Sequence, residues 1–121
     1  MSLRILIVDD EPTILRVART ILEKAGFIVL SATDGPQALG MLDTQAVDAL
    51  LTDLRMPGMS GTELIVEVRR RYASLPVAYM TAYSEDPGLT DVPLLRKPFG
   101  AQELINTVKK VMESHARRAS A

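Results

Sequence analysis

Acidic side chains directly follow two of the apolar segments in this 121-residue chain. The run ILIV ends in Asp9, Asp10 and Glu11, and the run ALLT ends in Asp53. A short continuous apolar run is typical of a strand buried on both faces, so these carboxylates are expected close to the protein interior. Crowded carboxylates in such a place lose hydration and repel one another, so they either take up protons or share a cation.

Two further groups with useful chemistry follow apolar segments. Thr81 ends the run PVAYMT, and Lys97, followed by Pro98, comes after LLR. Ligands of an open parallel sheet bind in the crevice at the carboxyl ends of its strands. Three carboxylates there favour Mg²⁺, which accepts carboxylates, water and phosphate oxygens. One carboxylate can then attack phosphorus as a nucleophile, while Lys97 and the Thr81 hydroxyl stabilise the phosphoryl oxygens.

The elements that must position these groups alternate between strand-like and helical patterns. The expected strands are 5–8, 27–32, 49–52, 76–81 and 94–96, and the expected helices start at Pro12, at Asp34 or Gly35, after Ser60 and at 101. Gly26 is expected to stop the first helix, Pro57 and Gly58 to form a turn, and Ser60 with Glu63 a capping box. Such alternation predicts an α/β fold, a single doubly wound parallel sheet of five strands with helices on both faces.

One connection is too short for the usual pattern. Only 12 residues separate Thr81 from Leu94, and Pro87, Gly88 and Pro93 interrupt them. A crossover that contains a helix needs about 10–12 residues. We therefore expect the fourth helix to be short or absent.

Composition limits the class of protein. The length fits one domain, 1–121, with a polar C-terminal tail at about 114–121. A net charge of −1 and a pI near 5.8 indicate no global attraction to nucleic acid or to an anionic membrane. The lack of cysteine excludes disulfides, thiol catalysis and zinc-thiolate sites, and it permits a cytoplasmic location. No apolar stretch has the length of a membrane span.

Four motifs together carry a family resemblance. Through VDDEP, LLTDLRMPGMSGTEL, PVAYMTA and RKPF, the chain resembles the receiver domain of two-component response regulators over essentially its whole length. The resemblance implies the flavodoxin-like strand order 2-1-3-4-5. It also implies a phosphorelay function, in which a histidine kinase or histidine phosphotransfer protein supplies a phosphoryl group from a phosphohistidine. Such a domain is not an enzyme for another substrate, because it catalyses only its own phosphorylation and dephosphorylation.

The resemblance assigns roles to residues at the carboxyl edge of the sheet. Asp53 is similar to the phosphoacceptor, Asp10 to the direct Mg²⁺ ligand and Asp9 to a ligand through water. The backbone carbonyl of Arg55 is expected to complete the protein's share of the coordination.

The same resemblance implies a switch. Lys97 is similar to the lysine that pairs with the phosphoryl group, and its bond to Pro98 is expected to be cis. Thr81 is similar to the switch hydroxyl, and Ala82 beside it is small enough to leave the acceptor accessible.

The chain departs from the family pattern at two places. Leu94 stands where many receivers carry a Tyr or Phe that turns inward when the switch operates. Tyr83 is either its substitute or a residue at the rim of the site. Arg55 and Tyr83 flank the site, and their bulk is expected to prolong the phosphorylated state by limiting access of water.

Other readings stay open beside this one. The chain is either a stand-alone receiver or a receiver cut from a hybrid histidine kinase or a longer regulator, and its oligomeric state is undetermined. A Mg²⁺-dependent aspartyl phosphatase would need a general acid two residues after Asp53, where Arg55 stands. A flavin or dinucleotide module would need a glycine-rich loop after the first strand, where acids stand instead. A degenerate receiver, which folds but is never phosphorylated, would lack some of the acceptor, acids, threonine and lysine. All of them are present in this sequence: Asp53, Asp9, Asp10, Thr81 and Lys97.

Three surface features have simpler interpretations. Glu11 is expected to cap the first helix. The run from Arg69 to Arg71 is expected to be a solvated helix end paired with Glu67 rather than a nucleic-acid site. His115 is expected on the surface rather than as a phosphohistidine.

Overall fold

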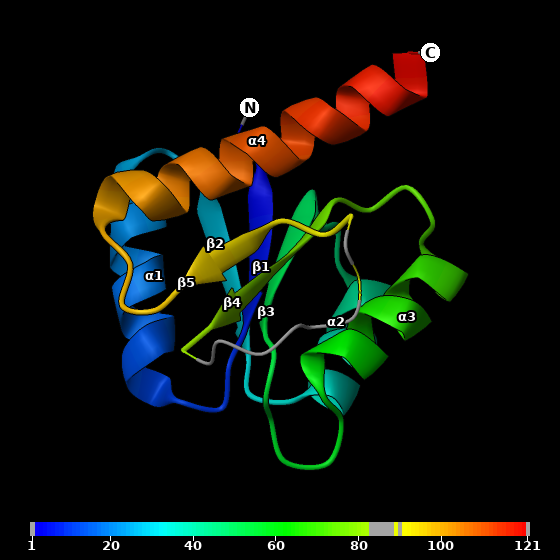
Figure 1. Ribbon diagram of the computed structural model, residues 1–121, viewed down its shortest axis with the longest axis horizontal. Coiled ribbons are helices and arrows are strands. Elements are labelled where there is room, and N and C mark those ends of the chain that lie inside the picture. Colours follow the sequence, from blue (N-terminus) through cyan, green and yellow to red (C-terminus); the bar gives the residue numbers. More distant parts are fainter. Residues whose placement is uncertain (1, 83–88, 90, 121) are drawn as a thin grey trace.

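The computed structural model describes residues 2–82, 89 and 91–120, and of residues 114–120 it describes the backbone alone (Figure 1). The elements within these residues are β1 (Arg4–Val8), α1 (Pro12–Lys24), β2 (Ile28–Ala32), α2 (Gly35–Thr44), β3 (Ala49–Asp53), α3 (Gly61–Arg71), β4 (Val77–Thr81), β5 (Leu94–Arg96) and α4 (Ala101–Ser120). The strands are parallel and lie in the order β2-β1-β3-β4-β5. The predicted fold class and strand order are therefore confirmed.

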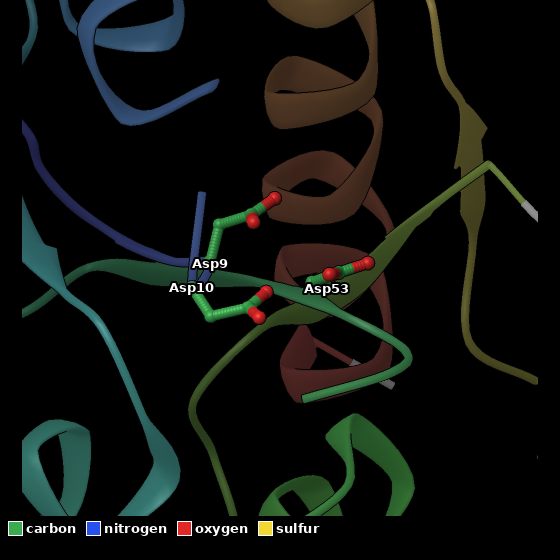
Figure 2. A group of neighbouring side chains, drawn as sticks. All are labelled: Asp9, Asp10 and Asp53. Atoms are coloured by element: carbon green, nitrogen blue, oxygen red, sulfur yellow. The ribbon is translucent and has the colours of Figure 1, made fainter. Parts of the chain in front are cut away.

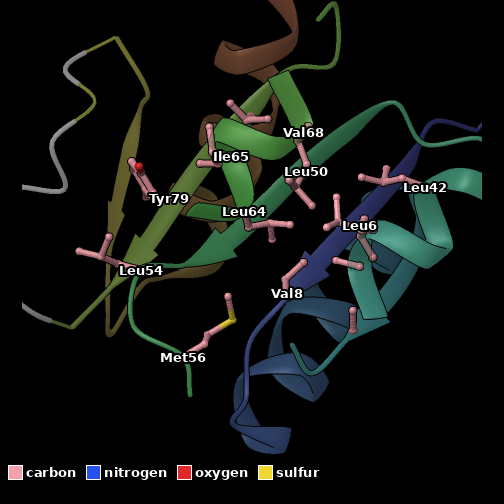
Figure 3. Close-up of a cluster of buried hydrophobic side chains, with 14 of the residues drawn as sticks. Leu6, Val8, Leu42, Leu50, Leu54, Met56, Leu64, Ile65, Val68 and Tyr79 are labelled. Atoms are coloured by element: carbon pink, nitrogen blue, oxygen red, sulfur yellow. The ribbon is translucent and has the colours of Figure 1, made fainter. Parts of the chain in front are cut away.

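Alternate side chains of each strand serve two separate hydrophobic clusters. Leu6, Val8 and Leu50 point to one face, which α2 and α3 cover (Figure 3). Ile5 and Leu51 point to the other face, which α1 and α4 cover. Because both faces are covered, β1 and β3 are apolar at successive positions instead of alternating with polar residues.

The predicted starts of α2 and α3 and two predicted glycine positions are confirmed. Asp34 accepts the Gln37 backbone N–H at the start of α2, and Ser60 with Glu63 forms the predicted capping box of α3. Gly26 after α1 and Gly58 in the turn after β3 have φ values of 96° and 82°, which glycine adopts more readily than other residues.

Two local expectations need correction. Glu11 stands at the N-cap position of α1, but its side chain makes no capping bond; instead the Asp9 carboxylate accepts the Glu11 N–H at 2.9 Å. An Asp side chain reaches a backbone N–H two residues ahead readily, whereas the longer Glu side chain is a poorer cap. The last helix also extends beyond 115 to Ser120, since the residues after 115 include good helix formers and no Gly or Pro.

The connection between β4 and β5 is only partly described. No helix occurs in its described residues, 82, 89 and 91–93, whereas 83–88 and 90 lie outside the described part. The β4–β5 pairing itself is regular, with Thr81 opposite Arg96. Within the described chain, no helix has both the length and the apolar character needed to cross a bilayer.

The basic end of α3 is paired as expected. Glu67 binds Arg70 and also Arg71, whose Nε lies 2.8 Å from the carboxylate. Arg69 binds Asp91 at 2.7 Å, which ties α3 to the segment before β5. The side chain of His115 lies outside the described part of the chain.

Candidate functional site

The acids predicted to act together do meet at the carboxyl edge of the sheet. Asp9 and Asp10 follow β1, and Asp53 is the last residue of the neighbouring strand β3. Figure 2 shows the three side chains near one another, and one carboxylate oxygen from each lies within 4.8 Å of the others. Asp9 and Asp53 are buried, whereas Asp10 is exposed. The cluster of three carboxylates is therefore open to solvent at Asp10.

Asp9 is held by partners on both carboxylate oxygens. Oδ1 accepts the Glu11 N–H at 2.9 Å, and Oδ2 lies 2.6 Å from the Lys97 Nζ. Its own backbone N–H is bonded to the Ala32 carbonyl of β2. The side chain is 0% exposed, so Asp9 has a single well-defined orientation.

Lys97 reaches the site from the far end of the chain. Its backbone N–H donates to the Thr81 carbonyl at 2.8 Å, which aligns the residue after β5 with the end of β4. Its Nζ lies 2.6 Å from Asp9, 3.4 Å from Asp53 and 3.9 Å from Glu11, and the side chain is 7% exposed. The Lys97–Pro98 peptide bond is cis, as the resemblance implied.

The charges in this site perturb one another. Burial, followed by the nearby Asp9 charge, raises the pKa of Asp53 to about 6, although Lys97 opposes the shift. Burial alone would lower the pKa of Lys97, but the hydrogen bond and charge of Asp9, with further help from Asp53 and Glu11, raise it above its usual value. The lysine is thus firmly cationic, while the carboxylate of Asp53 is only weakly stabilised as an anion.

The donor set fits a hard divalent cation. One ammonium group does not balance three carboxylates, and the clustered oxygens are the ligand type that Mg²⁺ prefers. Burial and the Asp9 charge raise the pKa of Asp53, and bound Mg²⁺ would oppose both effects by favouring the ionised carboxylate. The exposed Asp10 leaves room for coordinated water.

The remaining predicted residues stand at or just after the carboxyl ends of β3 and β4. Thr81 is fully buried at the end of β4, and Ala82 beside it is exposed. Arg55 is exposed and contributes, with Met56, Pro57 and Ser60, to a shallow pocket of about 310 Å³ in the loop after β3.

The sequence also singled out Leu94, Pro98 and Tyr83. Leu94 is half-buried and packs against the cluster under α2 and α3. Pro98 is exposed. Tyr83 lies outside the described residues, so its predicted role as a substitute switch stays a prediction.

Sequence reasoning missed two residues that touch the Asp53 backbone. The Thr52 hydroxyl donates to the Asp53 carbonyl at 3.0 Å. Gly61 packs so closely that a Cβ there would lie 2.1 Å from the same oxygen. For Thr52 the sequence offered only a polar residue inside a buried strand, and for Gly61 a glycine at the first position of a helix.

Comparison with known proteins agrees with the motifs. Residues 5–109 match the model of the response regulator receiver domain. Sensory transduction protein RegX3 of Mycobacterium tuberculosis is 38% identical over 114 residues, which cover 89% of this chain and 50% of that protein. Chemotaxis protein CheY of Pseudomonas aeruginosa is 37% identical over 120 residues, which cover 92% of this chain and 97% of CheY. The chain thus spans about half the length of RegX3 and nearly all of CheY.

A solved structure gives a similar result. Response regulator protein TrrA of Thermotoga maritima, in complex with Mg²⁺-BeF, is 32% identical, and the match covers 92% of this chain and 99% of that chain. Its TM-score is 0.83. The likeness therefore extends over nearly the whole fold.

Proposed function

Because this chain belongs to the response regulator receiver domain family, we propose that it is a phosphoacceptor in a two-component phosphorelay. Asp53 takes a phosphoryl group from a phosphohistidine on a histidine kinase or a histidine phosphotransfer protein. One observation carries the proposal: the buried Asp53 carboxylate lies 3.4 Å from the Lys97 ammonium and shares a cluster of oxygens with Asp9 and Asp10. This arrangement offers a nucleophile beside a fixed positive charge.

The transfer follows from these positions. An Asp53 carboxylate oxygen attacks phosphorus, the phosphorus–nitrogen bond of the donor breaks, and its electron pair returns to the imidazole. Lys97 balances charge on the phosphoryl oxygens, because its Nζ is already near the acceptor and is kept protonated by Asp9. Burial of Asp53 keeps much of the surrounding water away.

Asp9, Asp10, Asp53 and the backbone carbonyl of Arg55 are the residues that would hold Mg²⁺. When bound, Mg²⁺ supplies neutralisation of the acceptor carboxylate and of the phosphoryl oxygens. The oxygen cluster supports the three aspartates as ligands, and the similar protein TrrA forms a complex with Mg²⁺-BeF.

Phosphorylation then biases an equilibrium between two conformations. Thr81 is suited to this role because it ends β4, is buried, and has its carbonyl bonded to the backbone of Lys97. A phosphoryl group that binds both Lys97 and the Thr81 hydroxyl would draw the ends of β4 and β5 toward Asp53. In the sequence Ala82 follows Thr81 directly, Tyr83 comes two residues after Thr81, and Pro98 follows Lys97. We propose that these three residues take part in the change.

The proposed reaction phosphorylates only this chain and turns over no separate substrate. We propose that it catalyses only its own phosphorylation and dephosphorylation, in the cytoplasm. An aspartyl phosphatase is disfavoured, since Arg55 occupies the position where a general acid is needed. The match to half of RegX3 is compatible with a chain that is part of a longer regulator or of a hybrid histidine kinase, and the match to CheY with a stand-alone receiver.

Intact-mass measurement after incubation with Mg²⁺ and acetyl phosphate tests the acceptor. The parent should gain one phosphoryl group, and Asp53→Asn should gain none. Asp34→Asn, at the surface cap of α2, is the matched control and should be phosphorylated like the parent. An adduct on both the parent and Asp53→Asn, or on neither, would overturn the proposal. Repeated release of inorganic phosphate from a phosphorylated substrate would favour the phosphatase instead.

A further inference from the structure

We infer that Thr52 and Gly61 are positioning residues that hold the backbone of Asp53 so that its carboxylate meets Lys97 and Mg²⁺. The inference deepens the proposed function and rests on it for the phosphorylation step. Thr52 donates a hydrogen bond to the backbone carbonyl oxygen of Asp53, and Gly61 packs against the same oxygen. Both residues therefore act on the carboxylate through the backbone of Asp53.

The peptide group that links Asp53 to Leu54 is held at both ends. Its carbonyl oxygen accepts the Thr52 hydroxyl at 3.0 Å, and its N–H donates to the Met80 carbonyl of β4 at 3.0 Å. Thr52 is 0% exposed and belongs to the central strand β3, so its hydroxyl has little freedom to turn elsewhere. This peptide therefore has one orientation at the point where the sheet ends.

Gly61 presses the first turn of α3 against the same carbonyl. A Cβ at this position would lie 2.1 Å from the Asp53 oxygen and 3.0 Å from the Leu54 Cα, distances at which backbone atoms must move. The Gly61 N–H also donates to the Leu54 carbonyl at 2.8 Å. Only a residue without a side chain allows α3 to begin this close to the acceptor.

The first turn of α3 has little room to retreat. Thr62 Oγ1 lies 2.9 Å from the hydroxyl of Tyr79, a fully buried residue of β4 (Figure 3). The capping box of Ser60 and Glu63 fixes the backbone just before Gly61. A methyl group on Gly61 would thus displace the Asp53 peptide rather than the helix alone.

Such a displacement would reach the reacting atoms directly. The carbonyl carbon of Asp53 is bonded to its Cα, so displacement of this peptide also shifts Cα and Cβ and moves the carboxylate relative to Lys97, 3.4 Å away. Asp9 keeps its bonds to Lys97 and to the Glu11 N–H, because these do not involve Asp53. The expected defect is therefore a misplaced acceptor beside an intact lysine, and misplacement by about 1 Å can slow a reaction by about 100-fold.

Four variants separate this role from a general loss of stability. Thr52→Val removes the hydroxyl and keeps the branched shape, whereas Thr52→Ser keeps the hydroxyl. Gly61→Ala adds the methyl group against the carbonyl. Gly40→Ala is the matched control, since a Cβ on this exposed glycine of α2 meets nothing within 4 Å.

Three measurements are made on each variant. Urea denaturation shows that it is folded, and calorimetric titration of the unphosphorylated chain gives its Kd for Mg²⁺. The phosphorylation rate at a range of acetyl phosphate concentrations separates the maximal rate from the half-saturating concentration. Thr52→Val and Gly61→Ala should bind Mg²⁺ severalfold more weakly and lose about tenfold or more in maximal rate, at an unchanged half-saturating concentration. Thr52→Ser and Gly40→Ala should behave like the parent.

Several results would overturn the inference. One is a folded Thr52→Val variant with the Kd and maximal rate of the parent; another is Thr52→Ser being as defective as Thr52→Val, because the hydroxyl would then not be the cause. If Gly61→Ala does not fold, the two Thr52 variants decide the question.

Failure of the proposed function gives a different pattern. If the parent binds Mg²⁺ but is never phosphorylated, the phosphoacceptor proposal falls and the Mg²⁺ titrations alone judge the positioning role. A Kd raised in Thr52→Val but not in Thr52→Ser then supports it, and equal values overturn it. A parent that neither binds Mg²⁺ nor accepts a phosphoryl group overturns both proposals.

Discussion

Lys97 and Asp9, 88 positions apart in the chain, are joined by a 2.6 Å ion pair in which both side chains are almost completely buried. The pair orients the ammonium group before any phosphoryl group arrives. Charge that is already in place needs no reorganisation at the moment of reaction. The same pair also makes the site a determinant of stability.

Replacement of Lys97 by Met is expected to destabilise the chain when Mg²⁺ is absent. Removing the cation leaves Asp9 and Asp53 buried without compensation, so the free energy of unfolding should fall by about 3 kcal/mol at pH 7. Urea denaturation in EDTA measures the change. Lys109→Met, at an exposed position of α4, should alter stability by less than about 0.5 kcal/mol. Equal losses from the two variants would contradict the structural role of Lys97.

The raised pKa of Asp53 predicts a pH dependence with a definite sign. The unfolded chain releases this proton near the ordinary pKa of 3.8, whereas the pKa of about 6 in the folded chain keeps it bound until about pH 6. Between these values the folded state binds more protons, so the contribution of Asp53 to stability falls as pH rises from about 4 to about 6, by at most about 3 kcal/mol.

Denaturation of Asp53→Asn over this pH range checks the effect. In EDTA the variant should be more stable than the parent at pH 7, and the advantage should disappear near pH 4. Glu113→Gln, which removes one exposed acid of α4, is the control for a simple change in net charge. Added Mg²⁺ should reduce the difference in stability between the variant and the parent, since it stabilises the ionised carboxylate of the parent. A stability difference between Asp53→Asn and the parent that does not change with pH would argue against a raised pKa of Asp53.

Arg55 is expected to protect the phosphorylated form. It is exposed two residues after Asp53, where its side chain can limit the approach of water. Arg55→Ala should therefore lose the phosphoryl group severalfold faster than the parent, as measured by intact mass after removal of the donor. Arg16→Ala, at an exposed position of α1, should decay at the parental rate. Decay of Arg55→Ala that is no faster would refute this shielding role.

The capping box at the start of α3 is expected to contribute measurably to stability. Ser60→Ala removes the acceptor for the Glu63 N–H, which should lower the free energy of unfolding by about 1 kcal/mol. Ser74→Ala, at an exposed position before β4, controls for loss of a hydroxyl group. If thermal unfolding shows the same small change for both variants, the cap does not stabilise α3.

Local sequence patterns were sufficient for most of the fold. A continuous apolar run such as that of β1 is typical of a strand buried on both faces. Ser60 and Glu63 start a helix through contacts between residues only three positions apart. The position of Asp53 after such a run was enough to place it at the edge of the sheet. These inferences succeeded because each depends on neighbours in the chain.

Two inferences about helix ends were wrong, although they also rested on local patterns. Glu11 was expected to cap α1, but Asp9 takes its backbone N–H instead, and the same Asp9 also binds Lys97. The described end of α4 likewise lies beyond 115, because helix propensity continues through the polar residues there.

By itself, the sequence determined which residues stand at the ends of the strands, since burial of apolar runs and the spacing of helix signals act locally. Only the tertiary structure decided how those residues meet. Lys97 lies closer to Asp9 than to Asp53. Thr52 donates a hydrogen bond to the carbonyl of Asp53, and Gly61 packs against the same carbonyl. The reason is physical. Distances between strand ends are set by the packing of the whole sheet and its helices, in which a difference of one ångström separates a contact from a gap.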